Sequence, residues 1–107
     1  MSVDQIDVVD SIGIDKETGD VVLTISDHLE WSYKHLSTLQ SKINCYLSFI
    51  ESGEIYASYP FANGKKIVID IVHKYPMDAQ ALSFFQRAEM ALAEAGFELR
   101  RQYLSYQ

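Results

Sequence analysis

Hydrophobic and polar residues alternate with two different periods along this chain, and each period predicts a type of element. Between positions 34 and 52, apolar residues recur every three or four positions, which places them on one face of an α-helix that ends at Gly53. These apolar positions are Leu36, Leu39, Ile43, Leu47 and Ile50. A second helix is predicted from its cap, Asp78, to about Ala95. Its predicted buried face consists of Ala81, Phe85, Ala88, Leu92 and Ala95, widened by Phe84 and Ala91.

Strict alternation of apolar and polar residues predicts strands in most of the remaining chain. An irregular strand at 6–14 and a strand at 21–25 are joined by a turn at Gly19, which predicts a hairpin. A strand at 54–59 is followed by Asn63-Gly64, a strong hairpin signal, and by the clearest strand of the chain, at 66–73. A last strand is predicted at 97–104.

These elements predict a single α+β domain over residues 1–107 with the order ββαββαβ. We expect a two-layer sandwich in which both helices cover one face of a mostly antiparallel sheet. From the second strand onward the order is that of the ferredoxin-like fold, with an extra N-terminal strand. The segment between the second strand and the first helix is expected to be a loop, although Asp27 and Glu30 have the spacing of a capping box.

Two stretches of the sequence resemble a family of small bacterial proteins without an assigned activity. The first is the run Asp27-His28-Leu29-Glu30-Trp31, and the second is INCYLSFIESGEI, from Ile43 to Ile55. Ile12-Gly13-Ile14-Asp15 and the segment from Gly19 to Ser26 are similar to that family as well. The resemblance implies a bacterial origin and hence a cytoplasmic location. It implies no catalytic residue and no ligand.

The charge and the cysteine content narrow the classes of function. The chain carries 9 basic and 15 acidic residues, a formal net charge of −6, which argues against a nucleic-acid-binding protein. One cysteine, Cys45, excludes an internal disulfide. No secretory signal and no apolar run of about 18 residues is visible, so the sequence predicts a cytoplasmic protein that does not bind membranes.

The densest group of potential metal ligands lies around the predicted loop. Asp27, His28, Glu30 and His35 include imidazoles and carboxylates, but their spacing matches no standard zinc pattern. We therefore expect a solvated loop, and neither a metal nor a cofactor is predicted.

Other reactive side chains are expected to have structural roles. Asp70 lies between Val68 and Val72 on one face of the clearest strand, so its carboxylate needs solvent or a Lys or Arg partner. His73, three positions on, faces the opposite side at a strand end. Cys45 lies mid-helix without a base nearby and is expected to be a small buried apolar residue.

The strongest functional expectation concerns the face of the sheet that the helices leave uncovered. Val22, Tyr56, Val68 and Val72 are predicted to line this face, and a contiguous apolar patch there would mark a binding site. Seven tyrosines and Trp31 add side chains that are common in interfaces. The sequence thus favours a non-enzymatic protein-interaction module in which the uncovered face binds another protein, or a second copy in a homodimer. Its acidic composition suggests a basic partner.

An alternative is a small-molecule- or metal-binding domain with its site near the loop at 26–34. That site would lie between the loop and the strand end at 73–76 and would use His28, Glu30, Trp31 and His73. No catalytic residue is predicted in either case.

Overall fold

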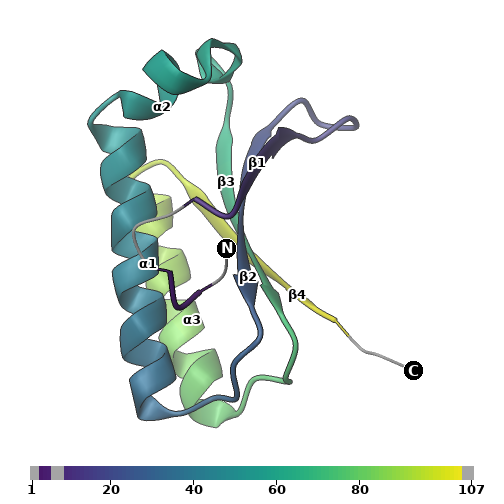
Figure 1. Ribbon diagram of the computed structural model, residues 1–107, viewed down its shortest axis with the longest axis vertical. Helices are drawn as coiled ribbons and strands as arrows, with labels where there is room; N and C mark the ends of the chain where they lie inside the picture. Colours follow the sequence, from purple (N-terminus) through teal and green to yellow (C-terminus); the bar gives the residue numbers. More distant parts are fainter. Residues whose placement is uncertain (1–2, 6–8, 105–107) are drawn as a thin grey trace.

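The protein consists of a four-stranded mixed sheet and a layer of helices, as seen in a computed structural model that describes residues 3–5 and 9–104 (Figure 1). The strands follow one another across the sheet in the order β1-β2-β3-β4. β1 pairs with β2 in antiparallel orientation, whereas β2, β3 and β4 are parallel. Their bounds are Ser11–Ile14 for β1, Val21–Asp27 for β2, Ile67–His73 for β3 and Glu98–Tyr103 for β4.

Both long helices lie on the same side of this sheet (Figure 1). Each connects two adjacent parallel strands, and because both connections move across the sheet in the same direction, a common handedness places both helices on one face. A short helix and a 3-10 turn lie beyond one end of the sheet and precede β3. The helices are α1 (Tyr33–Glu51), α2 (Glu54–Ser58) and α3 (Ala79–Glu94), and the 3-10 turn is η1 (Pro60–Ala62).

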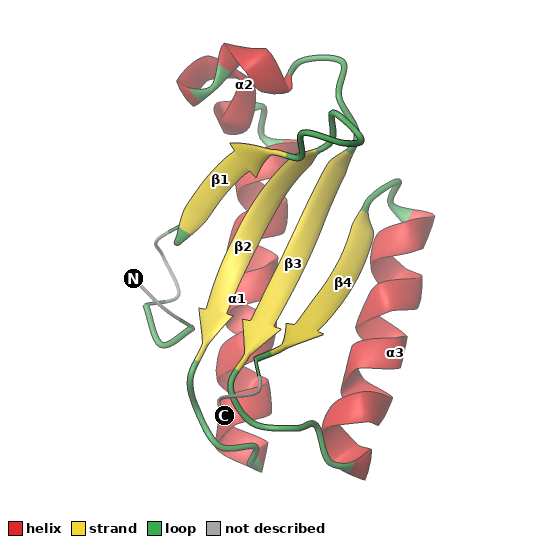
Figure 2. Ribbon diagram, turned by 90° about the vertical axis from the view of Figure 1, so that its right-hand side faces the viewer, coloured by secondary structure: helices red, strands yellow, loops and turns green. Residues whose placement is uncertain are grey.

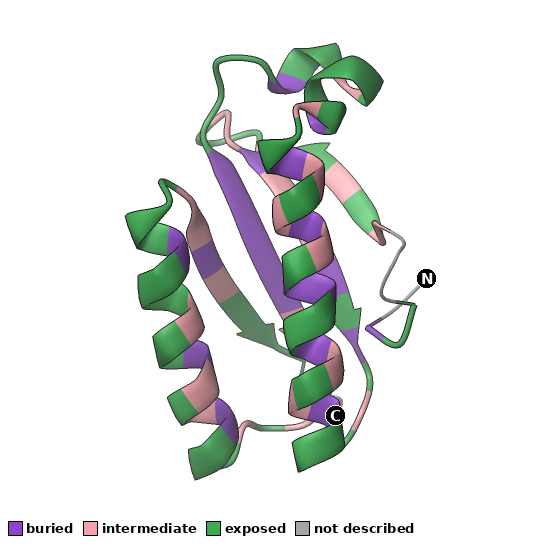
Figure 3. Cartoon of the chain, turned by 90° about the vertical axis from the view of Figure 1, so that its left-hand side faces the viewer, coloured by how far each residue is buried: buried purple, intermediate pink, exposed green. Residues whose placement is uncertain are grey.

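The core lies between the sheet and the two long helices (Figure 3). Every second residue of β2 and β3 faces the helices and is fully or almost fully buried. Leu39, Ile43, Tyr46 and Ile50 fill this layer from α1, while α3 supplies mainly Phe85 and Leu92. Burying a side chain of this size stabilises a fold by about 1.5–3 kcal/mol. The inward residues of the two strands are Val21, Leu23, Ile25, Ile67, Ile69 and Ile71.

The α+β class and both long helices are confirmed, but the prediction of a mostly antiparallel sheet is wrong. Residues 54–58 form α2 instead of a strand, so the order is ββααβαβ, and neither the ββαββαβ order nor its ferredoxin-like part is found. Ile55 and Tyr59 are four positions apart, which is the spacing of one helix face. In so short a segment the same residues also fit the alternation of a strand. Without that strand β3 has no hairpin partner directly before it. It pairs instead with β2, and the connection from β2 through α1 makes this pairing parallel.

The ends of the predicted elements were less accurate than their centres. Only 11–14 of the first predicted strand is a described strand, and residues 6–8 lie outside the described part. The hairpin at Gly19 is confirmed, with φ of 79° at that residue. Asp27 belongs to β2, and α1 is capped by Ser32, whose hydroxyl accepts a hydrogen bond from the His35 amide. The capping-box spacing of Asp27 and Glu30 therefore does not mark the start of this helix.

Candidate functional site

The face of the sheet without helices, here called the open face, points toward the viewer in Figure 2. It is more polar than the sequence suggested. Val68 is buried there, and Val22 and Val72 are half-buried, as expected. The register, however, places Thr24 beside Asp70 and Asp70 beside Arg100, so this polar row separates Val72 from Val68, whereas Val22 and Val68 are direct neighbours. The other polar residues of this face are Ser11, Ser26, Lys66, Glu98 and Gln102. Tyr56 lies in α2, so it does not line the open face as predicted, and the apolar residues of that face are the three valines.

Asp70 is the centre of this polar arrangement. Its Oδ2 accepts a hydrogen bond from Gln102 Nε2 at 2.7 Å and lies 3.7 Å from Arg100 Nε, which confirms the predicted basic partner. Its Oδ1 is buried and has no hydrogen-bond partner among the described residues. Burial raises the pKa of the Asp70 carboxyl, an effect that Arg100 and Gln102 partly oppose. Lys66 and Glu98 form a second, exposed ion pair at 2.7 Å on the same face.

The ends of the three parallel strands bring together a cluster of rings, the strand-end cluster, formed by Trp31, His35, His73 and Tyr103. Trp31 stacks on His35 with ring centroids 4.1 Å apart and meets His73 edge-on at 5.9 Å. Tyr103 stacks on the ring of His73, with centroids 5.6 Å apart. The indole Nε1 of Trp31 and Nδ1 of His73 both donate to the carbonyl of Tyr75, at 3.0 and 2.8 Å. In open sheets this edge often holds ligands, but here the chain's own rings fill it.

His35 has no ring nitrogen free for acid–base chemistry. Its Nδ1 lies 3.0 Å from the carbonyl oxygen of Glu30, which can only accept, so Nδ1 carries a hydrogen. Its Nε2 lies 2.6 Å from Asp27 Oδ2, so the two side chains form a hydrogen-bonded pair that is fully buried. Both nitrogens are thus engaged, and the Asp27–His35 pair fixes the start of α1 against the end of β2.

The structure separates the other residues that the sequence proposed for a site. It joins Trp31 and His73 as predicted, but in the interior, where His73 Nε2 is buried and without a partner among the described residues. His28 is exposed, and Glu30 uses its backbone carbonyl and not its carboxylate in this cluster. The expected solvated loop is wrong for Asp27 and His35, which are buried. Within the described residues, no three potential ligands gather around a metal position.

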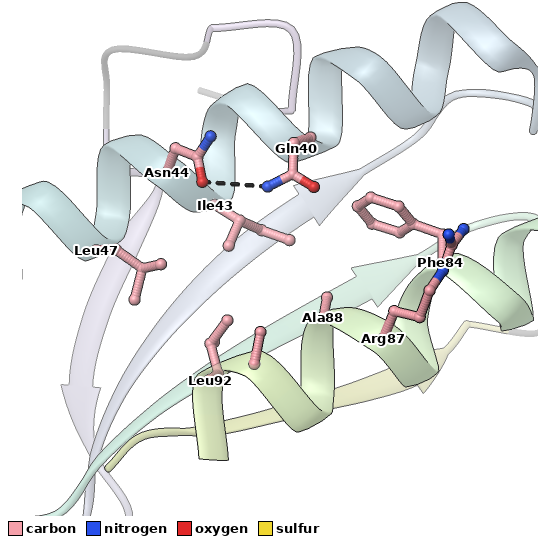
Figure 4. Close-up of a pocket in the computed structure, with 9 residues that line it drawn as sticks. Gln40, Ile43, Asn44, Leu47, Phe84, Arg87, Ala88 and Leu92 are labelled. Carbon is pink, nitrogen blue, oxygen red and sulfur yellow. Dashed lines mark hydrogen bonds between the residues drawn. The ribbon is translucent and has the colours of Figure 1, made fainter. Parts of the chain in front are cut away.

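A groove between α1 and α3, the helix groove, was not predicted from the sequence. Figure 4 shows Ile43 and Leu47 from α1 pointing toward Ala88 and Leu92 of α3, with Phe84 at one end. Two adjoining hollows, of about 280 and 260 Å³, make up the groove and share three lining residues. All lining residues are Tyr33, Leu36, Ser37, Gln40, Ile43, Asn44, Leu47, Gln80, Phe84, Arg87, Ala88, Ala91 and Leu92.

The helix groove lacks acidic residues, although the chain is acidic. Among the described residues that line it, none carries a carboxylate, and the one charged side chain is Arg87. The amide of Gln40 donates to Asn44 Oδ1 at 3.1 Å, so this pair satisfies part of its own hydrogen bonding. Arg87 is exposed, makes only a hydrogen bond of 3.4 Å to the Ser83 carbonyl, and has no ion pair within the described residues.

The α1 wall of the groove is held in place from its opposite side by a buried ion pair. Lys42 Nζ is 2.7 Å from Asp10 Oδ1 and donates to the Gln5 carbonyl at 2.8 Å. Tyr46 donates to the Thr24 carbonyl at 2.8 Å and accepts from the Asp10 amide at 2.9 Å, and its burial raises the pKa of its phenol. These polar anchors fix α1 against β2 and the N-terminal segment.

A protein-family model described as a family of unknown function (DUF6572) matches residues 1–105, and the chain therefore belongs to this family. This membership confirms the resemblance to a family without an assigned activity, while the bacterial origin inferred from it stays a prediction. No curated protein and no solved structure matches the chain. None of the helices in the described residues is long and apolar enough to cross a membrane.

Proposed function

We propose that the protein is a non-enzymatic protein-interaction module and that it binds its partner in the helix groove between α1 and α3. The observation that carries this proposal is an acid-free groove on the surface of an acidic chain, in which half-buried apolar side chains lie between exposed polar ones. Removing exposed apolar surface from water is favourable, so a partner that covers such surface gains binding free energy. The groove replaces the open face as the proposed contact surface, because the open face is polar at its centre.

Binding is a better fit to these residues than catalysis. Both ring nitrogens of His35 are occupied, and His73 is buried among rings. Cys45 is half-buried in the middle of α1, away from the helix start that would favour a thiolate. The side chains with catalytic potential therefore serve the fold. In the groove, Leu47, Phe84 and Ala88 pack against the core on one side and stay partly exposed on the other.

The test is affinity capture from a lysate of the native cell, with the full chain as bait and quantitative mass spectrometry as readout. Ala91→Trp places an indole in the helix groove, and Val72→Trp is the matched substitution on the open face. We expect partners of the wild type to be retained by Val72→Trp and lost by Ala91→Trp, with both variants melting near the wild type. Loss with Val72→Trp alone would move the contact surface to the open face.

A second candidate function is small-molecule binding near the loop at 26–34. It is favoured by a hollow of about 350 Å³ beside the start of α1, lined in part by Leu29, Glu30 and His35. Thr38 also lines this hollow, so Thr38→Phe should abolish any ligand-induced rise in melting temperature that the wild type shows in a metabolite screen. A rise that persists in this variant would place the ligand elsewhere.

A further inference from the structure

The shape of the helix groove restricts what kind of segment fits it, and this argument rests on the proposed function. Each of its two hollows holds about nine water volumes of about 30 Å³, which is the scale of one or two side chains. The hollows adjoin at Gln40, Phe84 and Arg87, so they form a row along the two helices. Because this row is open along its length, a small ligand would keep much of its surface in water, whereas a protein segment would cover the row.

The walls of the groove decide the backbone conformation of that segment. α1 and α3 use their backbone groups within their own helices, so the groove offers no strand edge to an incoming chain. An extended segment would lay unpaired amides and carbonyls over the half-buried apolar side chains of Leu47, Phe84 and Ala88, at a cost of about 1–3 kcal/mol for each buried group. A helix satisfies its own backbone groups and presents only side chains.

The length and the charge of the groove define the helix further. The α3 wall, the shorter of the two, runs from Gln80 to Leu92, twelve positions at about 1.5 Å each, so it spans about 18 Å or a little over three helical turns. Arg87 lies where the hollows adjoin, has no ion pair within the described residues, and faces no carboxylate in the groove lining. A carboxylate on the incoming helix would complement this charge.

From these features we infer that the partner segment is an amphipathic α-helix of about three turns, with apolar residues on one stripe and a carboxylate that pairs with Arg87. The apolar stripe fills the two hollows, and the carboxylate selects the orientation of the helix. The acidic composition of the whole chain suggested a basic partner, but the local charge of the groove reverses that expectation.

The probe that tests this inference is a phage-displayed library of random peptides long enough for a stable helix, about 16 residues. Wild-type chain is the target, and every enriched peptide is measured again on Ala91→Trp and on Val72→Trp. We expect peptides with an i, i+3, i+4, i+7 apolar pattern and an acidic residue, which become helical on binding and lose affinity at least tenfold on Ala91→Trp.

Charge exchange then tests the role of Arg87. Replacing the peptide's acidic residue by Gln should weaken binding about two- to fivefold, as for other exposed ion pairs, and replacing it by Lys should weaken binding further. Arg87→Glu should invert this preference, whereas Arg100→Glu on the open face should leave it unchanged.

The outcomes separate this inference from the proposed function. Peptides that need the groove but bind in extended form, or that prefer Lys opposite Arg87, would overturn the inference and leave the groove as a binding surface. Enrichment of peptides that Ala91→Trp binds as well as the wild type does, or no enrichment at all, would overturn both.

Discussion

The helix groove and the open face are two uncovered surfaces of the same molecule, yet they differ in how their charges are satisfied. On the open face, Asp70 meets Arg100 and Gln102, and Lys66 meets Glu98. In the groove, apolar side chains from two helices face each other, and Arg87 has no acidic partner in the described residues. A face whose charges pair within the fold is suited to water, whereas an apolar groove with an unpaired charge is suited to a partner.

The largest effect is expected when the buried ion pair that anchors the α1 side of the groove is removed. Lys42→Ala leaves Asp10 as an uncompensated buried charge and should lower the free energy of unfolding by about 3–5 kcal/mol. Urea denaturation measures this loss. Binding in the groove should fall with the population of folded protein. A loss below about 1 kcal/mol would show that the pair does not anchor α1.

Tyr46→Phe should have a smaller effect on the same wall. It removes a hydroxyl that serves two backbone groups, which should cost about 1–3 kcal/mol. Because the folded-state pKa of Tyr46 is raised above its ordinary value of 10.0, the unfolded chain ionises first, and wild-type stability should fall as pH rises above about 10. Denaturation between pH 9 and about 11 should show a shallower fall for Tyr46→Phe; equal slopes would contradict this.

Asp70→Asn tests the polar centre of the open face, and its effect on stability is expected to be smaller than that of Tyr46→Phe. The folded-state pKa of Asp70 is raised above its ordinary value of 3.8, so the folded chain holds its proton more tightly than the unfolded chain does. The contribution of Asp70 to stability is therefore greatest at acid pH and declines as pH rises through these two pKa values. Asp70→Asn should remove this decline in denaturation curves recorded from pH 3.5 to about 7. A steeper decline in the variant would contradict the burial of Asp70.

The smallest expected effect comes from a matched pair of arginine variants. Arg87→Ala should change the free energy of unfolding by no more than about 0.5 kcal/mol, because Arg87 has no ion pair within the described fold. Arg100→Ala should cost more, though no more than about 1 kcal/mol, since its side chain is partly exposed beside Asp70. Thermal unfolding of both variants measures the difference, and a larger loss for Arg87→Ala would assign Arg87 to the fold.

Local pattern predicted much of the fold, and the wrong pairing followed from one short segment. The long helices and β3 have periods that extend over many residues, so their identity and core faces were accurate. The segment that became α2 is five residues long, too short for its period to distinguish a helix from a strand. Because of this one assignment, the predicted sheet is mostly antiparallel, whereas the observed sheet is mixed.

The sites were harder to predict because they depend on polar residues that fold into the interior. Lys42 and His35 are polar residues on the buried face of α1, and only their three-dimensional partners, Asp10 and Asp27, explain their burial. The sequence does contain one indication of the groove. Phe84 and Ala91 make the apolar face of α3 wider than the part of it that packs on the sheet. Sequence alone assigned that extra width to the core, whereas Ala91 is exposed in the groove.

The most direct test of the account is methyl NMR of the chain with and without the partner isolated by affinity capture. Methyl resonances of Ile43, Leu47 and Ala88 in the groove are expected to shift or broaden on binding. The methyl resonances of Val22, Val68 and Val72 on the open face should stay in place. Shifts confined to the three valines, with the groove methyls unchanged, would contradict the assignment of the helix groove as the binding surface.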